Sequence, residues 1–211
     1  TYQNVSDAPS TALRTLQVVL TDGDGGTSNS ATKTINVSAV NDAPVITSDG
    51  GGATASISVA ENATAVTTIT ATDVDLPAQS LTYSIVGGAD AARFSINATS
   101  GALSFLVAPN YEAPTDIGAN NVYDVIVQVS DGSLSDSQAI AVTVTPVNDN
   151  APTITSDGGG ATASVNVAEN STAVTTVTAT DVDLPAQSLT YSIIGGADAA
   201  RFSINATTGA L

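Results

Sequence analysis

Apolar and polar residues alternate along much of the chain with the period of two that is typical of half-buried β-strands. No stretch shows the sustained 3.6-residue periodicity of an amphipathic helix. Turns rich in Gly, Asp and Pro separate the alternating segments, so the pattern predicts an all-β fold made of antiparallel β-sandwiches with Greek-key connections. The clearest predicted strands are Thr54–Val59, Val66–Ala71, Leu81–Ile85, Ala102–Phe105, Val122–Val129 and Ala139–Thr145.

The chain contains a long internal repeat. Residues 44–103 return as residues 152–211, an offset of 108, with seven substitutions in sixty positions. The first residues follow the end of the same unit less closely: "TYQ" at Thr1 matches "NYE" at Asn110, and "LQVVLTDGDG" follows the pattern of "VIVQVSDGSL". We therefore expect tandem domains, with one complete repeat at 44–150. It would lie between the C-terminal strands of a preceding repeat, 1–43, and the N-terminal part of a following repeat, 151–211.

The two partial repeats raise a packing question. Half a sandwich leaves strand edges unpaired and half a core uncovered. We expect residues 152–211 of one chain and 1–43 of the next to complete one domain, either in a head-to-tail polymer or in one continuous tandem chain.

Composition excludes several classes of protein. The chain has no His and no Cys, which removes the commonest general base, thiolate metal sites and disulfides. Twenty acids face four bases, for a net charge of −16, so we expect no nucleic-acid partner. No apolar run is long enough to cross a bilayer, so we expect no membrane insertion. The natural counter-charge is a cation, and the only glutamates are Glu61, Glu112 and Glu169.

Short acidic motifs recur at predicted turns and strand ends. Each supplies carboxylate or amide oxygens, and calcium takes six to eight such ligands. "DVD" must bend if both aspartates are to reach one ion or two neighbouring ions, because alternate residues of a strand point apart. Any one motif is also an ordinary turn former. The motifs are "AEN" at 60–62, "DVD" at 73–75, "NYE" at 110–112, "SDG" at 130–132 and "VNDNAP" at 147–152.

Taken together and in this order, the motifs resemble those of cadherin repeats. "LTYSI" at Leu81 and "FSINATSGAL" at Phe94 are also similar to that family's core strand and hairpin. The near-identical, Ala/Thr/Gly-rich copies resemble the cadherin-like repeats of very large bacterial surface and secreted adhesins. The resemblance implies β-sandwiches joined end to end, with Ca²⁺ held at each junction.

Carried over residue by residue, the resemblance implies a set of calcium ligands at each of two junctions. The second junction would use Glu61, Glu112, Asn148, Asp149, Asn150, Asp181 and Asp183. The first would use Asn41, Asp42, Asp73, Asp75 and Asp131.

Departures from the family pattern predict unequal junctions. Asn110 stands where the family has an acid, and at the first junction Thr1 and Gln3 replace Asn110 and Glu112. "VNDAP" is also one residue shorter than "VNDNAP". We therefore expect fewer or weaker calcium sites at the first junction.

The resulting functional expectation is a non-enzymatic, calcium-dependent structural and adhesion segment on the cell surface or secreted, of the kind found in biofilm adhesins. Its partners would be neighbouring repeats, with homophilic or head-to-tail self-association possible. Three alternatives stay open at this point. The segment could be a repeat subunit of an extracellular filament, a protein- or surface-glycan-binding module using Tyr83, Tyr123 or Tyr191, or a hydrolase pairing Glu61 with Glu112.

Overall fold

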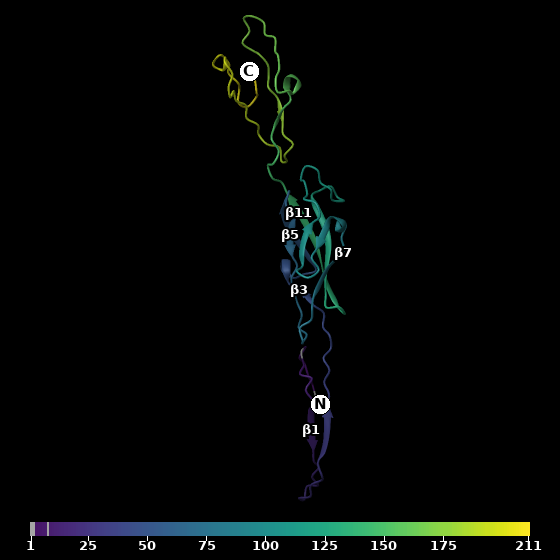
Figure 1. Ribbon diagram of the computed structural model, residues 1–211. Helices are drawn as coiled ribbons and strands as arrows, with labels where there is room; N and C mark the ends of the chain where they lie inside the picture. Colours follow the sequence, from purple (N-terminus) through teal and green to yellow (C-terminus); the bar gives the residue numbers. More distant parts are fainter. Residues whose placement is uncertain (1–2, 8) are drawn as a thin grey trace. The chain divides into compact units, whose positions relative to one another are not determined.

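The computed structural model describes residues 3–7 and 9–211 (Figure 1). The expected equivalence of Thr1 and Tyr2 to Asn110 and Tyr111 lies outside these residues. The described residues form two compact units. The first takes those within 1–57, 64–107 and 122–143, and the second those within 58–63, 108–121 and 144–211.

Within the described residues, strands make up the regular structure, apart from short 3-10 turns. Among these residues no helix has the length and apolar character needed to span a bilayer. The strands are β1 (Arg14–Val18), β2 (Ala31–Ile35), β3 (Val45–Ile46), β4 (Thr54–Ala60), β5 (Ala65–Thr68), β6 (Ala71–Thr72), β7 (Thr82–Gly87), β8 (Phe94–Ile96), β9 (Ala102–Phe105), β10 (Val122–Ser130), β11 (Ser135–Thr145), β12 (Thr153–Ile154) and β13 (Ala179–Thr180). The 3-10 turns are η1 (Ser48–Gly50), η2 (Ala91–Arg93), η3 (Ser156–Gly158) and η4 (Ala199–Arg201).

The complete repeat is a β-sandwich. One sheet has the strand order β4-β11-β10-β7, a second has β5-β9-β8, and β3 pairs with β6. Along β10, the antiparallel pairing with β11 runs from Val122↔Thr143 to Ser130↔Ser135. Figure 1 shows β3, β5 and β7 within this body. The predicted all-β sandwich is confirmed.

The core forms where the two sheets face each other. Alternate residues of β10 and β11 are buried, so Val125, Val127 and Val129 are each 0% exposed. Three aromatic rings join the sheets. The Phe94 and Phe105 ring centroids lie 4.6 Å apart, and Tyr123 meets Phe105 edge-on at 5.1 Å. Such ring pairs stabilise the packing beyond what the buried apolar area contributes. They therefore help to hold the β10–β11 hairpin against β8 and β9.

One predicted strand is divided in the structure. The segment 66–71 breaks into β5, which pairs with β9, and β6, which pairs with β3. At the break, the Ile69 N–H donates to the Gly101 carbonyl at 2.9 Å. The two-residue β3 was not predicted, because alternation cannot be detected over so few residues. The three-residue β8 lies in the segment at Phe94 that resembles the family's hairpin.

The C-terminal copy repeats the local structure but not the burial of its apolar residues. β12 and β13 pair as β3 and β6 do, with Thr153↔Thr180 matching Val45↔Thr72 at the offset of 108. Ile46 and Phe94, however, are 2% and 5% exposed, while their counterparts Ile154 and Phe202 are 55% and 48% exposed. Strands equivalent to β10 and β11 do not cover this copy within the described chain.

Gly101 lies in a turn that packs closely against the backbone of Ile69. It has φ +72°, and a Cβ built there would lie 2.1 Å from the Ile69 carbonyl oxygen. Gly132 also has positive φ, +100°, but has open space around that position. We expect Gly132→Ala to cost about 1–2 kcal/mol of unfolding free energy from backbone strain alone. Gly101→Ala should cost at least about 3 kcal/mol because backbone must move as well.

Urea unfolding of the two glycine variants and the parent chain measures this difference. Equal losses for Gly101→Ala and Gly132→Ala would show that the close approach of Gly101 to Ile69 is unimportant.

Candidate metal centres at the repeat ends

Three carboxylates from distant parts of the sequence meet at the C-terminal end of the complete repeat. Glu61 follows β4, Glu112 lies in the loop between β9 and β10, and Asp149 lies after β11. One carboxylate oxygen from each lies within 4.8 Å of those of the other two. We call this group the glutamate triad.

Glu61 holds the glutamate triad in place. Glu61 is buried, with only 3% of the residue exposed. One carboxylate oxygen accepts the Tyr111 N–H at 2.8 Å and the other accepts the Val147 N–H at 2.7 Å. A buried charge requires such donors, because leaving it without them costs several kcal/mol. Glu61 therefore fixes both the loop that carries Glu112 and the segment that carries Asp149.

The remaining predicted residues of the second junction join the same network. The Asn150 side-chain amide donates to Asp149 and to Asp183, each at 2.7 Å. Asp183 is 1% exposed, and its N–H donates to Asp181 at 3.0 Å. The Leu184 N–H donates to Glu112 at 3.2 Å. The structure thus brings the predicted acids and amides of this junction together.

A second triad forms beside the β10–β11 turn, whereas the glutamate triad includes Asp149, which follows the last residue of β11. Asp73 and Asp75 follow β6, and Asp131 occupies the β10–β11 turn. Their carboxylate oxygens also lie within 4.8 Å of one another. We call this group the aspartate triad. The bend that "DVD" requires comes from Asp73, whose carboxylate accepts the Asp75 N–H at 2.9 Å.

The predicted linker residues of the first junction reach the aspartate triad. Asn41 donates from its amide to Asp131 at 2.7 Å, and the Asp42 N–H donates to Asp75 at 2.9 Å. The five predicted residues of this junction are therefore assembled around one centre.

The shorter linker has an amide followed by a carboxylate, Asn41-Asp42, whereas the longer linker has a carboxylate followed by an amide, Asp149-Asn150. At the second junction it is the Asn150 N–H that donates to Asp183, as the Asp42 N–H donates to Asp75. Asp42 therefore corresponds to Asn150, two residues before the proline in both linkers. The first junction carries a carboxylate where the second carries an amide, which increases repulsion near Asp75.

The pKa values follow from this arrangement. Burial raises the pKa of Asp42 above its ordinary 3.8, and the carboxylates of Asp75, Asp7 and Asp73 raise it further. By contrast, hydrogen bonds from the Leu134 and Ser133 backbone, then from the Asn41 side chain, lower the pKa of Asp131. The two acids of one junction are thus shifted in opposite directions.

Sequence reasoning missed two glutamines of these centres and included Asn62 only as part of the "AEN" motif, without placing it at a junction. Asn62 donates to Asp149 at 2.6 Å. Gln79 donates to Asn41 at 2.6 Å and to Asp75 at 3.2 Å, and its copy Gln187 accepts from Asn148 at 2.7 Å. The signal was present, because each glutamine follows the second aspartate of "DVD" by four residues in both copies.

Both triads fit a calcium ion by geometry and by chemistry. Two oxygens bound to one Ca²⁺ at 2.3–2.6 Å can be at most about 5 Å apart, and each triad meets this limit at 4.8 Å. Among the described residues, one buried oxygen of Glu112 and one of Asp73 have no hydrogen-bond partner. A buried carboxylate oxygen without a donor is costly, and a cation would compensate both. Side-chain amides can rotate to present their oxygens as further ligands.

Comparison with known families agrees with this architecture. The fold and the paired acidic centres define a tandem β-sandwich repeat with charged ends. Residues 55–145 match the family model described as Cadherin domain. Human protocadherin Fat 1 is 33% identical over 144 residues, covering 65% of this chain. Rabbit (Oryctolagus cuniculus) cadherin-16 is 35% identical over 132 residues, covering 57%.

Solved structures show the same fold. The protocadherin gammaB7 EC3-6 cis-dimer structure superimposes with a TM-score of 0.64 at 27% identity, covering 94% of this chain and 50% of that one. The comparisons support a cadherin-superfamily repeat. The chain spans only 3% of protocadherin Fat 1 and 15% of cadherin-16. These relatives are animal proteins, so they give no support to the expected likeness to bacterial adhesins.

Asp149→Asn separates repulsion from ligation. Asp149 is exposed, so its substitution leaves the core intact. In EDTA the variant should be as stable as the parent or more stable by up to about 1 kcal/mol, because repulsion in the glutamate triad falls. In calcium the variant should instead be less stable than the parent, since it has lost a charged calcium ligand. Thermal unfolding in both conditions measures the sign. Asp124→Asn, an exposed acid outside both triads, is the control and should show no reversal.

The opposite pKa shifts of Asp42 and Asp131 predict opposite pH dependences in EDTA. The raised pKa of Asp42 means that its charge destabilises the fold above that pKa, and protonation relieves this as pH falls. Asp42→Asn should therefore be more stable than the parent near neutral pH and equal to it in acid. Asp131, with a lowered pKa, stabilises above pH 3.8 and loses this as pH falls through the lowered value.

Asp131→Asn should accordingly be less stable than the parent near neutral pH, and the two should converge in acid. Urea unfolding across the acidic range measures both variants. If the unfolding free energies of the parent, Asp42→Asn and Asp131→Asn change with pH in parallel, the opposite pKa shifts of Asp42 and Asp131 are wrong.

Proposed function

We propose that this chain is an extracellular structural and adhesion segment in which Ca²⁺ at the repeat junctions stiffens a tandem array. The observation that carries the proposal is the pair of triads, one that includes the β10–β11 turn and one that includes the segment after β11. In each triad the carboxylate oxygens lie within 4.8 Å of one another, and one buried carboxylate oxygen has no hydrogen-bond partner. In each network, residues from a linker and from folded turns are connected directly.

Electrostatics gives the ion its role. Two carboxylates at 4.8 Å repel by about 3 kcal/mol at an effective dielectric near 20, and less where solvent screens them. A divalent cation bound between the carboxylates attracts both of them and outweighs their repulsion. The linker would therefore be restrained when the ion binds. Small polar contacts between domains otherwise permit relative motion. The ion would therefore act as a stiffener rather than as a catalytic group.

An extracellular location agrees with the names of similar structures. One of them is titled protocadherin gamma B2 extracellular cadherin domains 3–6, and it is 27% identical with a TM-score of 0.58 over 87% of this chain. Calcium sites in extracellular modules are commonly half-filled at about 10⁻⁴–10⁻³ M. We propose that the array belongs to a large surface or secreted adhesin, with neighbouring repeats as its first partners.

The alternative functions gain less support. Tyr123 is 1% exposed and packs edge-on against Phe105, so it belongs to the core and cannot offer a sugar-binding face. Both oxygens of Glu61 are occupied by backbone N–H donors. That arrangement suits a fixed ligand better than a general acid or base, which must exchange a proton with a substrate.

The two junctions should differ in calcium affinity. The first has Gln3 in place of Glu112 and a shorter linker, so it lacks the glutamate triad. We expect calorimetric titration to show a tighter and a weaker class of sites. Asp149→Ala should weaken the tighter class at least about tenfold, the usual order for loss of one charged ligand. Asp75→Ala should weaken the other class. Small-angle scattering should show a longer, less variable particle with calcium than with EDTA.

Asp124→Asn again serves as the matched control and should leave both classes unchanged. Absence of calcium binding at millimolar concentration, or identical scattering in calcium and EDTA, would overturn the proposal. A single class of calcium sites would contradict only the prediction that the two junctions differ in affinity.

A further inference from the structure

Two side-chain amides connect two carboxylates of the aspartate triad. The Asn41 amide nitrogen donates to Asp131 at 2.7 Å, and the Gln79 amide nitrogen donates to Asp75 at 3.2 Å. The two amides are themselves joined, because the Gln79 nitrogen also donates to the Asn41 side-chain oxygen at 2.6 Å. Gln79 and Asn41 therefore form a continuous chain of hydrogen bonds between Asp75 and Asp131, which we call the amide bridge.

The carboxylates fix which way each amide of the bridge points. An ionised carboxylate can only accept hydrogen bonds, whereas a side-chain amide has one accepting oxygen and one donating nitrogen. Asn41 must therefore turn its nitrogen toward Asp131, which leaves its oxygen facing Gln79. Gln79 meets that oxygen and the Asp75 carboxylate with the two N–H groups of a single nitrogen. The amide bridge thus presents only N–H donors to the two acids.

The amide bridge attaches the linker to the folded repeat. Asn41 belongs to the linker "VNDAP", Gln79 lies between β6 and β7, and Asp131 lies between β10 and β11. The next linker residue is attached at the same place, since the Asp42 N–H donates to Asp75 at 2.9 Å. Two successive linker residues are therefore held at the aspartate triad by hydrogen bonds.

One oxygen of Asp75 is saturated by these contacts. The same atom, Oδ2, accepts both the Asp42 N–H and the Gln79 amide, and an oxygen offers two lone pairs. A cation that uses this oxygen must therefore replace one of the two donors. The Gln79 bond is the longer one, 3.2 Å against 2.9 Å, and it comes from a flexible side chain rather than from the backbone. Gln79 is therefore the donor that would give way.

The amide bridge does not remove the need for a cation. It reaches two carboxylates of the triad, while one buried oxygen of Asp73 has no hydrogen-bond partner among the residues that the structure describes. A neutral amide also carries no net charge, so the repulsion among three nearby carboxylates persists. The amide bridge and a bound cation are thus alternative ways of holding the same linker.

The second copy shows why Gln79 has this role. Gln187 occupies the same position 108 residues later, but its amide nitrogen lies 3.5 Å from Asp183. There the side-chain donor to the acid is Asn150 from the linker, at 2.7 Å. The first linker has Asp42 in that place, and a carboxylate side chain cannot donate. Gln79 therefore supplies at the first junction the amide that the linker supplies at the second.

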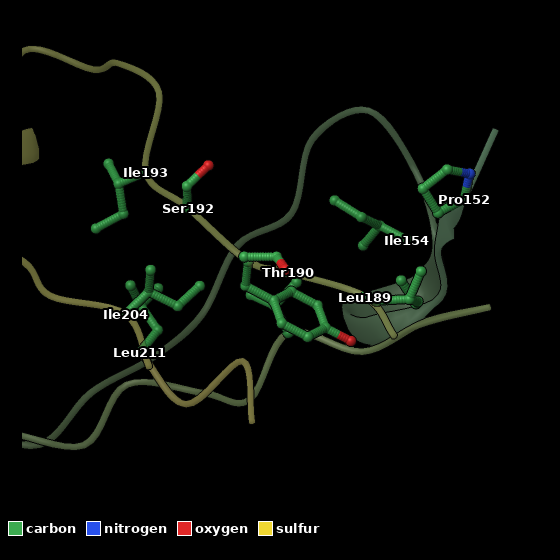
Figure 2. A pocket seen from close by; sticks show the side chains of 11 residues that line it. Pro152, Ile154, Leu189, Thr190, Ser192, Ile193, Ile204 and Leu211 are labelled. Atoms are coloured by element: carbon green, nitrogen blue, oxygen red, sulfur yellow. The ribbon is translucent and has the colours of Figure 1, made fainter. Parts of the chain in front are cut away.

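The apolar pocket of the C-terminal copy does not contribute to this difference. The pocket has a volume of about 420 Å³, and its lining includes Ile154 and Leu189 (Figure 2). Neither Gln187 nor Asp183 lines it. Asp75 and Asp183 are also similarly buried, at 6% and 1% exposed. The two glutamines therefore differ because of the linker residue beside each acid.

We propose that Gln79 sets the calcium affinity of the first junction, by holding Asn41 and Asp75 when no cation is bound and releasing Asp75 when one binds. The inference rests on the proposed function, since it requires a cation at the aspartate triad. A contact that exists only in the cation-free form stabilises that form, and it weakens cation binding by the same factor. Gln79 is thus a positioning residue that lowers the affinity for calcium and keeps the linker attached without it.

The main experiment follows calcium binding at each junction separately in the full chain. Titration with calcium is monitored by NMR through the backbone N–H signals of Asp42 at the first junction and Asn150 at the second. Gln79→Met removes both donors and keeps the length of the side chain. Its calcium affinity at the first junction should be at least about threefold higher than that of the parent, which corresponds to one hydrogen bond of ordinary net strength. The second junction should be unchanged.

Gln128→Met is the matched control. The Gln128 amide donates to the Ser135 hydroxyl at 3.2 Å, the same length as the bond from Gln79 to Asp75, but outside both triads. This variant should leave the calcium affinity of both junctions unchanged. Gln187→Met should change the second junction less than Gln79→Met changes the first, because the Gln187 nitrogen lies farther from its acid.

A second measurement tests the amide bridge without any cation. In EDTA the backbone N–H groups of Asn41 and Asp42 should be rigid in the parent, with NMR order parameters of about 0.85. In Gln79→Met they should fall toward about 0.6, because the linker has lost part of its attachment. In saturating calcium the two chains should agree. A role of Gln79 in folding alone would lower the order parameters in calcium as well.

The inference is overturned if Gln79→Met binds calcium at the first junction no more tightly than the parent. Weaker binding would identify Gln79 as a calcium ligand instead. Unchanged order parameters in EDTA would also overturn it, because the amide bridge would then not hold the linker. Failure of the proposed function gives a different result, namely that calcium shifts neither the Asp42 nor the Asn150 signal of the parent.

Discussion

Burial of the β10–β11 hairpin is the interaction on which the rest of this structure depends. Its inward rows include Val125, Val127 and Val142, each 0% exposed, and they lie across from the aromatic pair of β8 and β9. Each fully buried side chain of this size contributes about 1.5–3 kcal/mol. The C-terminal copy shows the effect of lacking this cover, since nearly identical residues have the same turns but exposed apolar side chains.

The same hairpin also positions charge. Its turn carries Asp131 into the aspartate triad, while the end of β11 leads to Val147 and Asp149. The two acidic centres are thus formed by different parts of the chain, and each gathers its own carboxylates. The apolar core thus fixes where repulsion accumulates, and the repulsion in turn makes a divalent cation the natural partner of each end.

The two junctions illustrate how one residue changes the electrostatics. Both linkers end in Ala-Pro, and the backbone contact two residues before the proline is kept in each. The side chain at that position is a carboxylate in Asp42 and an amide in Asn150. Burial raises the pKa of Asp42, and the neighbouring carboxylate of Asp75 raises it further. The amide of Asn150 instead donates a hydrogen bond to Asp183.

Alternation and the turn residues were enough to predict the all-β sandwich, and the internal repeat gave the offset of 108 residues between the two copies. These features are local or periodic, so they are visible along one dimension. The division of residues 66–71 between two sheets, the anchoring of Glu61 by two distant backbone donors and the contribution of Gln79 were decided by the tertiary structure. Each depends on segments far apart in sequence meeting in space, and alternation says nothing about which segments meet. Burial depends on such contacts too: Ile46 and Ile154 have almost the same sequence around them, and within the described residues the β10–β11 hairpin covers Ile46 but no hairpin covers Ile154.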